Sequence, residues 1–159
     1  MKIILLCGES GVGKTSIALE LCKDSKYNLV KSFTDRPKRF NEEKDHFFID
    51  KKDFICTPKE KIAAYSSING YIYYTIKNQF LEDKINVYIV DLIGMNRIMK
   101  NLPKAEVFSV LIKRKKVYID ENRKNRNIKI PTKSDVDIVI NNNKSLKTVI
   151  NTIKKMEEL

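Results

Sequence analysis

Glycine, proline, cysteine and histidine are scarce in this chain of 159 residues, with 5 Gly, 4 Pro, 3 Cys and 1 His, and tryptophan is absent. Three widely spaced cysteines without a Cys-x-x-Cys pair exclude a disulfide framework and indicate a reducing compartment. A single histidine excludes a His-based zinc site. The longest apolar run near the start, residues 3–7, is too short to span a bilayer, and no cleavable signal pattern surrounds it. We therefore expect a cytoplasmic protein without membrane partners.

Acidic residues are outnumbered by basic ones, 20 against 31, which gives a net charge of +11. This excess favours an anionic partner such as a nucleotide, a nucleic acid or an acidic surface. The competing interpretation is compositional, because Lys, Asn and Ile are abundant together and net charge bears on solubility as much as on function. Only 6 of the basic residues are arginines, the side chain that offers phosphate a planar, bidentate fork. Each arginine is therefore a candidate anion ligand.

Short apolar segments alternate with helical patterns along most of the chain. The segments that read as buried strands are 2–7, 29–30, 87–90, 107–112 and 136–140. The segments that read as helices are 14–22, 76–83, 94–101, 117–126 and 145–159. This alternation predicts an α/β fold with a parallel central sheet, in one domain.

The stretch from about 32 to 75 breaks that rhythm. Residues 32–45 are polar and predict a loop, a short strand follows at 46–49, and Asp50 could cap a brief helix. Asn69-Gly70, a strong hairpin dipeptide, separates two strands at 62–67 and 71–75. We interpret 32–75 as an insertion over the carboxyl edge of the sheet, with a core formed by 1–31 and 76–159.

A glycine-rich phosphate loop follows the first strand: Gly8-Glu9-Ser10-Gly11-Val12-Gly13-Lys14-Thr15 matches GxxxxGK[ST]. The glycines let amide groups point at a phosphate, and the next helix adds its positive N-terminus. In such a loop Lys14 reaches the β- and γ-phosphates and the Thr15 hydroxyl ligates Mg²⁺. We expect ATP phosphates to be bound by Gly8, Ser10, Gly11, Val12, Gly13, Lys14, Thr15 and Ser16.

An acidic residue, Asp91, ends the buried segment 87–90. A carboxylate at that place can hold Mg²⁺ through water or reach a substrate. The alternative is an ordinary strand end at which an aspartate begins a turn. With the phosphate loop present we favour the functional interpretation, and we expect Thr15 and Asp91 to be the metal ligands.

Two of the six arginines, Arg36 and Arg39, lie in the segment Ser32-Phe33-Thr34-Asp35-Arg36-Pro37-Lys38-Arg39. Their guanidinium groups would suit a second phosphate. The alternative is a solvated basic loop.

The motifs together resemble guanylate kinase and its phage-type nucleoside monophosphate kinase relatives. They are the phosphate loop, Ser-x-Thr-x-Arg with a second arginine, the Asp-aromatic-Phe element at 45–48, the Tyr-x-Thr hairpin end and Asp-x-x-Gly at 91–94. The resemblance covers residues 1–95 well and the rest loosely, although 137–141 is similar to the last strand of the family. It implies a P-loop NTPase three-layer fold with a small monophosphate-binding insertion and a short lid at about 114–133.

The resemblance also implies an activity, the transfer of phosphate from ATP, with Mg²⁺, to a nucleoside monophosphate. The residues matched to the substrate site are Ser32, Arg36, Arg39, His46, Tyr73, Thr75 and Asp91, of which Thr75 and Asp91 match positions at or near the guanine. His46 replaces a phosphate-binding tyrosine, and a neutral histidine can still donate one hydrogen bond. Ala64 falls where the family has an acidic residue that reads the guanine edge, which leaves the base open.

Two lid arginines, Arg123 and Arg126, lie one helical turn apart and would suit the charge of the transition state. The alternative is an exposed basic helix. The residues expected to act in catalysis are Lys14, Arg36, Arg123 and Arg126.

Two further function classes stay open. A guanylate-kinase-like binding module without turnover usually lacks the complete phosphate loop, which is intact here. A P-loop ATPase acting on nucleic acid would use the positive charge, but no basic patch interleaved with aromatic residues supports it. We expect a nucleotide substrate and no nucleic-acid partner, and a monomer or homodimer.

Overall fold

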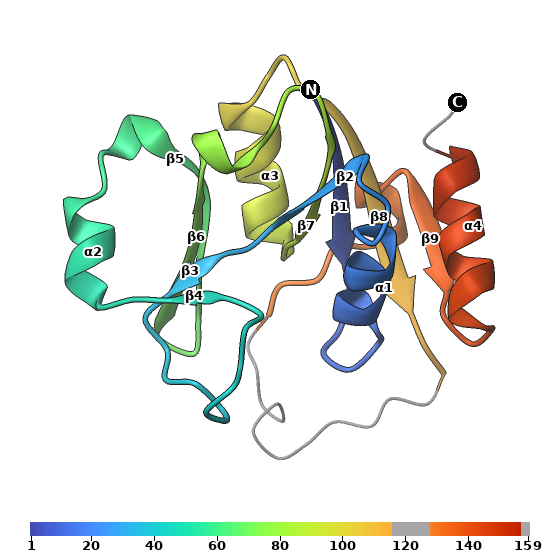
Figure 1. Cartoon of the computed structure of the whole chain (residues 1–159), viewed down its shortest axis with the longest axis horizontal. Helices are drawn as coiled ribbons and strands as arrows, with labels where there is room; N and C mark the ends of the chain where they lie inside the picture. The colour runs from blue at the N-terminus through green and yellow to red at the C-terminus, as the bar shows by residue number, and fades with distance from the viewer. Residues whose placement is uncertain (116–127, 157–159) are drawn as a thin grey trace.

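The computed structural model describes residues 1–115 and 128–156 of the chain. It contains a five-stranded sheet of order β2-β7-β1-β8-β9 and a four-stranded sheet of order β4-β3-β6-β5 (Figure 1). The predicted helix at 117–126, with Arg123 and Arg126, lies outside the described residues.

The central sheet is wholly parallel. Its strands are β2 (Tyr27–Val30), β7 (Ile85–Ile89), β1 (Lys2–Cys7), β8 (Glu106–Lys113) and β9 (Ile138–Asn141). The middle strand β1 is buried along nearly its whole length, as expected for a parallel sheet covered on both faces. The predicted α/β fold with a parallel central sheet is confirmed.

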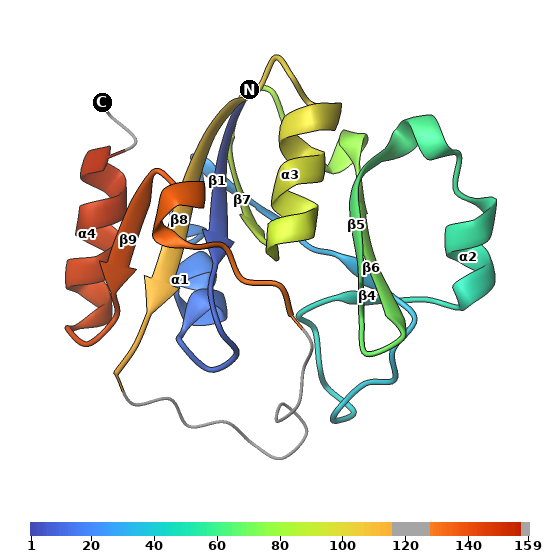
Figure 2. The ribbon, with the colours of Figure 1, turned by 180° about the vertical axis from the view of Figure 1, so that it is seen from behind.

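Alternate residues of β1 serve opposite faces of the sheet, because side chains along a strand alternate. Ile4 and Leu6 belong to the apolar cluster with α1 (Lys14–Leu21) and α4 (Leu146–Met156). Ile3 and Leu5 belong to the cluster with α3 (Leu92–Asn101). The sheet is therefore the middle of three layers, with α1 and α4 on one face and α3 on the face turned to the viewer in Figure 2.

The second sheet is built from residues 33–76. Its strands are β3 (Phe33–Thr34), β4 (Phe47–Phe48), β5 (Ile62–Ile68) and β6 (Tyr71–Ile76), and α2 (Lys51–Cys56) connects β4 toward β5. The Asn69-Gly70 hairpin turn has both residues at positive φ, 52° and 82°, as a tight hairpin turn requires. The prediction of a loop over 32–45 missed β3, because its two residues are held by pairing with distant Tyr73 and Tyr74. The boundaries of the insertion remain predictions.

The helix predicted at 76–83 is wrong. The chain makes only a short 3₁₀ turn at Lys77–Gln79 before β7. The Gln79 side chain accepts hydrogen bonds from the Ile76 backbone amide (2.9 Å) and the Thr75 hydroxyl (2.5 Å), and it donates to the Lys31 carbonyl (2.8 Å). These tertiary contacts outweigh the helical tendency of the segment.

The second sheet is fastened to the first through α3. The Asn101 side chain donates to the Ala63 carbonyl at 3.0 Å. The Arg97 guanidinium donates to the Tyr65 carbonyl and lies 3.2 Å from the centre of the Tyr65 ring. These contacts fix the second sheet relative to the central sheet, and the site forms between the two sheets. None of the helices in the described part of the chain is long and apolar enough to cross a membrane.

Candidate functional site

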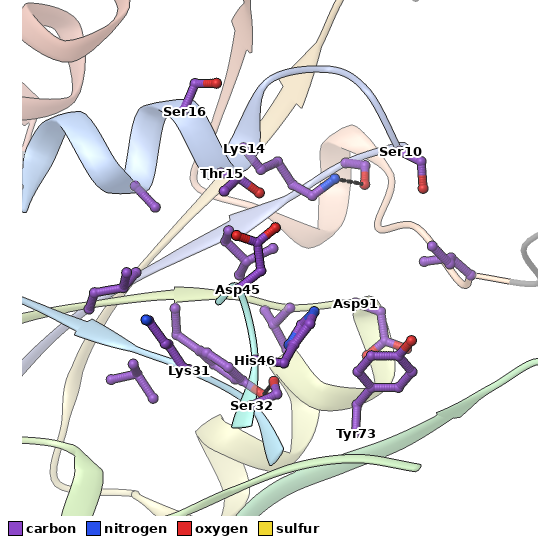
Figure 3. A pocket seen from close by; sticks show the side chains of 18 of the residues that line it. Ser10, Lys14, Thr15, Ser16, Lys31, Ser32, Asp45, His46, Tyr73 and Asp91 are labelled. Carbon is purple, nitrogen blue, oxygen red and sulfur yellow. Dashed lines mark hydrogen bonds between the residues drawn. The ribbon is translucent and has the colours of Figure 1, made fainter. Parts of the chain in front are cut away.

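A cavity of about 670 Å³ lies between the phosphate loop, the carboxyl ends of β1 and β7, and the second sheet (Figure 3). Its size and its place at the carboxyl edge of a parallel sheet suit a small ligand. Residues predicted from five separate motifs line this one cavity. They are Gly8, Ser10, Gly11, Gly13, Lys14, Thr15, Ser16, Ser32, Arg39, His46, Tyr73 and Asp91.

The phosphate loop approaches its neighbours so closely that side chains are excluded at two of its glycines. A Cβ at Gly8 would press into the carbonyl oxygen of Ile112 on β8. Gly13, the residue before α1, has φ of 100°, and a Cβ there would meet the side-chain amide of Asn142. The loop is therefore bare backbone at these points, which suits an anion cradle made of amides.

Lys14 bends back over this loop. Its Nζ donates to the carbonyl oxygens of Gly8 (2.7 Å) and Glu9 (2.6 Å). The ammonium group is thus held across the loop, where phosphate oxygens can take the place of the carbonyls. Thr15 and Ser16 are exposed on the first turn of α1, and Figure 3 shows Ser16 pointing away from the opposite wall. Val12 is buried in the apolar core, so its side chain lies outside the cavity.

The opposite wall carries hydroxyl and ring groups. Ser32 Oγ lies 3.0 Å from the Tyr88 hydroxyl, and the two share a hydrogen bond. Burial raises the pKa of Tyr88 to about 12, so its phenol is neutral at physiological pH. The His46 ring packs edge-on against Tyr73, with centres 5.5 Å apart. This wall can donate hydrogen bonds to an anion, and its hydroxyl oxygens can also accept hydrogen bonds from donors of a ligand.

Asp91 serves as the N-cap of α3. Its Oδ1 accepts a hydrogen bond from the Gly94 amide at 2.8 Å, and its side chain also accepts from Ser66. Burial raises the pKa of Asp91, and these two hydrogen bonds oppose the shift. Residues 1–115 and 128–156 contain no cluster of three His, Cys, Asp or Glu side chains able to hold a metal by themselves. A divalent ion here would need oxygen ligands from a bound nucleotide.

Two residues predicted for the substrate site lie apart from the main cavity. Arg36 is 6% exposed and lines a smaller neighbouring cavity of about 360 Å³, together with Arg39 and Tyr73. Thr75 is fully buried, and its hydroxyl donates a hydrogen bond to the Gln79 side chain.

Three residues with evident contacts in or beside the site were missed by sequence reasoning: Glu43, Asp45 and Asn142. Glu43 binds both insertion arginines, and Asn142 reaches the phosphate loop. The carboxylate of Asp45 lines the cavity and is directed toward the side formed by Lys14 and Thr15 (Figure 3). No local sequence signal distinguishes Glu43 from its neighbour Glu42. For Asp45 there was a signal, because it stands beside the predicted ligand His46.

The comparison with protein-family models gave no match. Two curated guanylate kinases are similar in sequence: that of Thermotoga maritima is 38% identical over 90 residues (54% of this chain), and that of Mycoplasma mobile is 38% identical over 121 residues (70% of this chain). The matches span 42% and 60% of the lengths of these relatives, respectively.

The fold also matches a solved structure. The crystal structure of guanylate kinase from Anaplasma phagocytophilum aligns with a TM-score of 0.71 at 19% identity, over 97% of this chain and 82% of that one. Fold and sequence agree: in both, this chain resembles guanylate kinases, and it spans less than two thirds of the length of these two sequence relatives.

Proposed function

We propose that this protein is an ATP-dependent nucleoside monophosphate kinase, which converts a nucleoside or deoxynucleoside monophosphate to the diphosphate. One observation carries the proposal: an intact phosphate loop and a second polar wall with Arg39, His46 and Tyr73 line the same cavity. Two anion sites facing each other in one cavity suit transfer between two phosphates, a reaction that needs mainly positioning and charge. Similarity to the guanylate kinases supports the same reaction.

The donor side fits ATP with Mg²⁺. The glycine cradle leaves room for a phosphate chain, and the Thr15 hydroxyl and the Asp91 carboxylate are the hard oxygen ligands that Mg²⁺ prefers. ATP would supply the phosphoryl group, and the metal would neutralise its charge. In this scheme Lys14 exchanges the carbonyls of Gly8 and Glu9 for β- and γ-phosphate oxygens.

The acceptor side is assigned to the insertion. Arg39, His46, Tyr73 and Ser32 would hold the monophosphate from the opposite wall, and Arg36 would support them from the smaller cavity. Arg123 and Arg126 in the lid at about 114–133 are proposed to meet the transferring group. Closure of insertion and lid would exclude water and limit ATP hydrolysis. We further propose that the enzyme acts in the cytoplasm as a monomer or homodimer.

An ADP-release assay with ATP, Mg²⁺ and a panel of GMP, dGMP, AMP, CMP and dTMP tests the proposal. At least one monophosphate should raise ADP release 100-fold or more above the rate with ATP alone. Lys14→Met should abolish the stimulation, whereas Lys61→Met, at an exposed site, should keep it. Absence of stimulation by every monophosphate would end the proposal. Tight monophosphate binding without ATP binding would instead favour a binding module.

A further inference from the structure

Glu43 is an acidic residue buried in the polar loop between β3 and β4. It is 2% exposed, in a loop whose neighbouring residues Glu42 and Lys44 are exposed. A buried carboxylate is costly unless it is paired and hydrogen-bonded. The groups that pair with the Glu43 carboxylate therefore indicate the role of this loop.

The pairing groups are the two arginines of the insertion. Arg36 donates to Glu43 from Nη1 (2.9 Å to Oε2) and from Nη2 to Oε1. Arg39 donates from its backbone amide (2.8 Å to Oε2) and from Nη1 (3.2 Å to Oε1). One carboxylate thus accepts four hydrogen bonds from two arginines, three from guanidinium groups and one from the Arg39 backbone amide, and the bidentate pair fixes the plane of the Arg36 guanidinium.

The charge state of Glu43 is also settled by these contacts. Burial by itself raises the pKa of Glu43, but the hydrogen bonds and charges of Arg36 and Arg39 outweigh it and hold that pKa at about 2. The carboxylate is therefore ionised at neutral pH. It cancels one of two like charges that would otherwise repel each other, and the cluster keeps a net charge of +1.

The two arginines are used differently within this cluster. Arg36 also donates from Nη1 to the Pro37 carbonyl (2.8 Å) and packs 5.1 Å from the Phe48 ring centre, so its Nη groups are engaged within the protein. Its place is the smaller cavity. Arg39 makes the longer of the guanidinium contacts to Glu43, has a side chain 15% exposed, and lines the main cavity. Arg39 is the member of the pair that faces the ligand space.

We propose that Glu43 is a positioning residue for the acceptor phosphate: it anchors Arg36 as a buried support and orients Arg39 toward the main cavity. The inference deepens the proposed kinase function and rests on it for the identity of the ligand. A competing role is that of a plug, in which the carboxylate occupies the phosphate site and is displaced by substrate. The two roles predict opposite effects of removing the charge.

The test compares Glu43→Gln with Glu42→Gln, a matched change at the exposed neighbour. Positioning predicts that Glu43→Gln raises the KM for the best monophosphate at least 10-fold and leaves the KM for ATP within 2-fold, whereas Glu42→Gln changes neither. An unchanged or lowered KM for the monophosphate in Glu43→Gln would overturn the proposal, and a lowered one would identify a plug. If Glu43→Gln does not fold, Glu43→Asp replaces it in the test. This variant keeps the negative charge but moves the carboxylate away from the two arginines, and the same split between the two KM values is expected.

A second measurement separates this inference from the proposed function. In ¹⁵N–¹H NMR spectra of arginine side chains, the Nη–H signals of Arg36 and Arg39 should be protected from exchange in wild type and in Glu42→Gln. In Glu43→Gln, or in Glu43→Asp if the amide variant does not fold, the Arg39 signals should broaden or disappear. Retained Arg39 signals would overturn the proposal even for an enzyme without turnover, whereas failure of wild type to use any monophosphate counts against the kinase function alone.

Discussion

The side-chain amide of Asn142 donates a 2.7 Å hydrogen bond to the carbonyl oxygen of Val12, and so ties the end of β9 to the phosphate loop. Asn142 is buried, and its backbone amide donates to the Lys113 carbonyl at the end of β8, also at 2.7 Å. The missing side chain of Gly13 gives the Asn142 amide its space. The shape of the loop therefore depends on a strand far along the chain as well as on its own glycines.

Replacing Asn142 should loosen the phosphate loop. Asn142→Asp keeps the shape but sets an acceptor against the Val12 carbonyl, which costs about 1–3 kcal/mol for an unsatisfied buried group. We expect a lower melting temperature and ATP binding weakened about 10-fold, since about 1.4 kcal/mol corresponds to that factor. Calorimetric titration with ATP measures this, with Asn141→Asp at the exposed neighbour as the control. Equal ATP affinity in the two variants would show that the contact does not shape the loop.

Acid should weaken the protein through Glu43. Its folded-state pKa of about 2 lies below the ordinary value of 4.5, so its contribution to stability is present above about pH 4.5 and is lost as the pH falls toward 2. The shift corresponds to about 3 kcal/mol at most. Urea unfolding of wild type and Glu43→Gln between pH 7 and pH 3 should show a stability difference that shrinks toward acid. A difference independent of pH would contradict the assignment, and Glu42→Gln should follow wild type throughout.

The capping and metal roles of Asp91 should separate in two substitutions. Asparagine can cap a helix as aspartate does, whereas alanine cannot, at a cost of about 1 kcal/mol. We therefore expect Asp91→Ala to lower the melting temperature more than Asp91→Asn. If the carboxylate also holds Mg²⁺, Asp91→Asn should lose at least 10-fold in turnover and need more Mg²⁺, while Asp83→Asn at an exposed site should not. Full turnover in Asp91→Asn would limit Asp91 to the cap.

The parts of the molecule that were predictable from sequence depend on neighbours along the chain. Five apolar segments sufficed for the parallel sheet, and the phosphate loop is a contiguous motif whose glycines carry their own geometry. The failed helix at 76–83 and the undetected strand β3 were decided by contacts of Gln79 and Tyr73 with distant segments. The partners of Glu43 and Asn142 were hidden for the same reason, because their burial follows from packing and not from local pattern.

The acceptor base should be read with little selectivity. Among the polar residues that line the cavity, Ser32, Ser66 and Tyr88 are buried and carry hydroxyls, and each hydroxyl can donate or accept a hydrogen bond. The Asp91 carboxylate there already accepts from Gly94 and Ser66, and Ala64 is fully buried outside the cavity.

A site that pairs a dedicated partner with each polar group of its substrate discriminates by about 10⁴-fold, whereas hydroxyls able to switch direction do not. We expect kcat/KM to span less than about 100-fold across GMP, dGMP, AMP, CMP and dTMP, since the hydroxyls of Ser32, Ser66 and Tyr88 can pair with either an amino or a carbonyl edge. Tyr88→Phe removes one hydroxyl and should change the ratios of kcat/KM among the monophosphates. The KM for ATP should change by a smaller factor. A preference for one base above about 1,000-fold would show that a group beyond these hydroxyls reads the base edge.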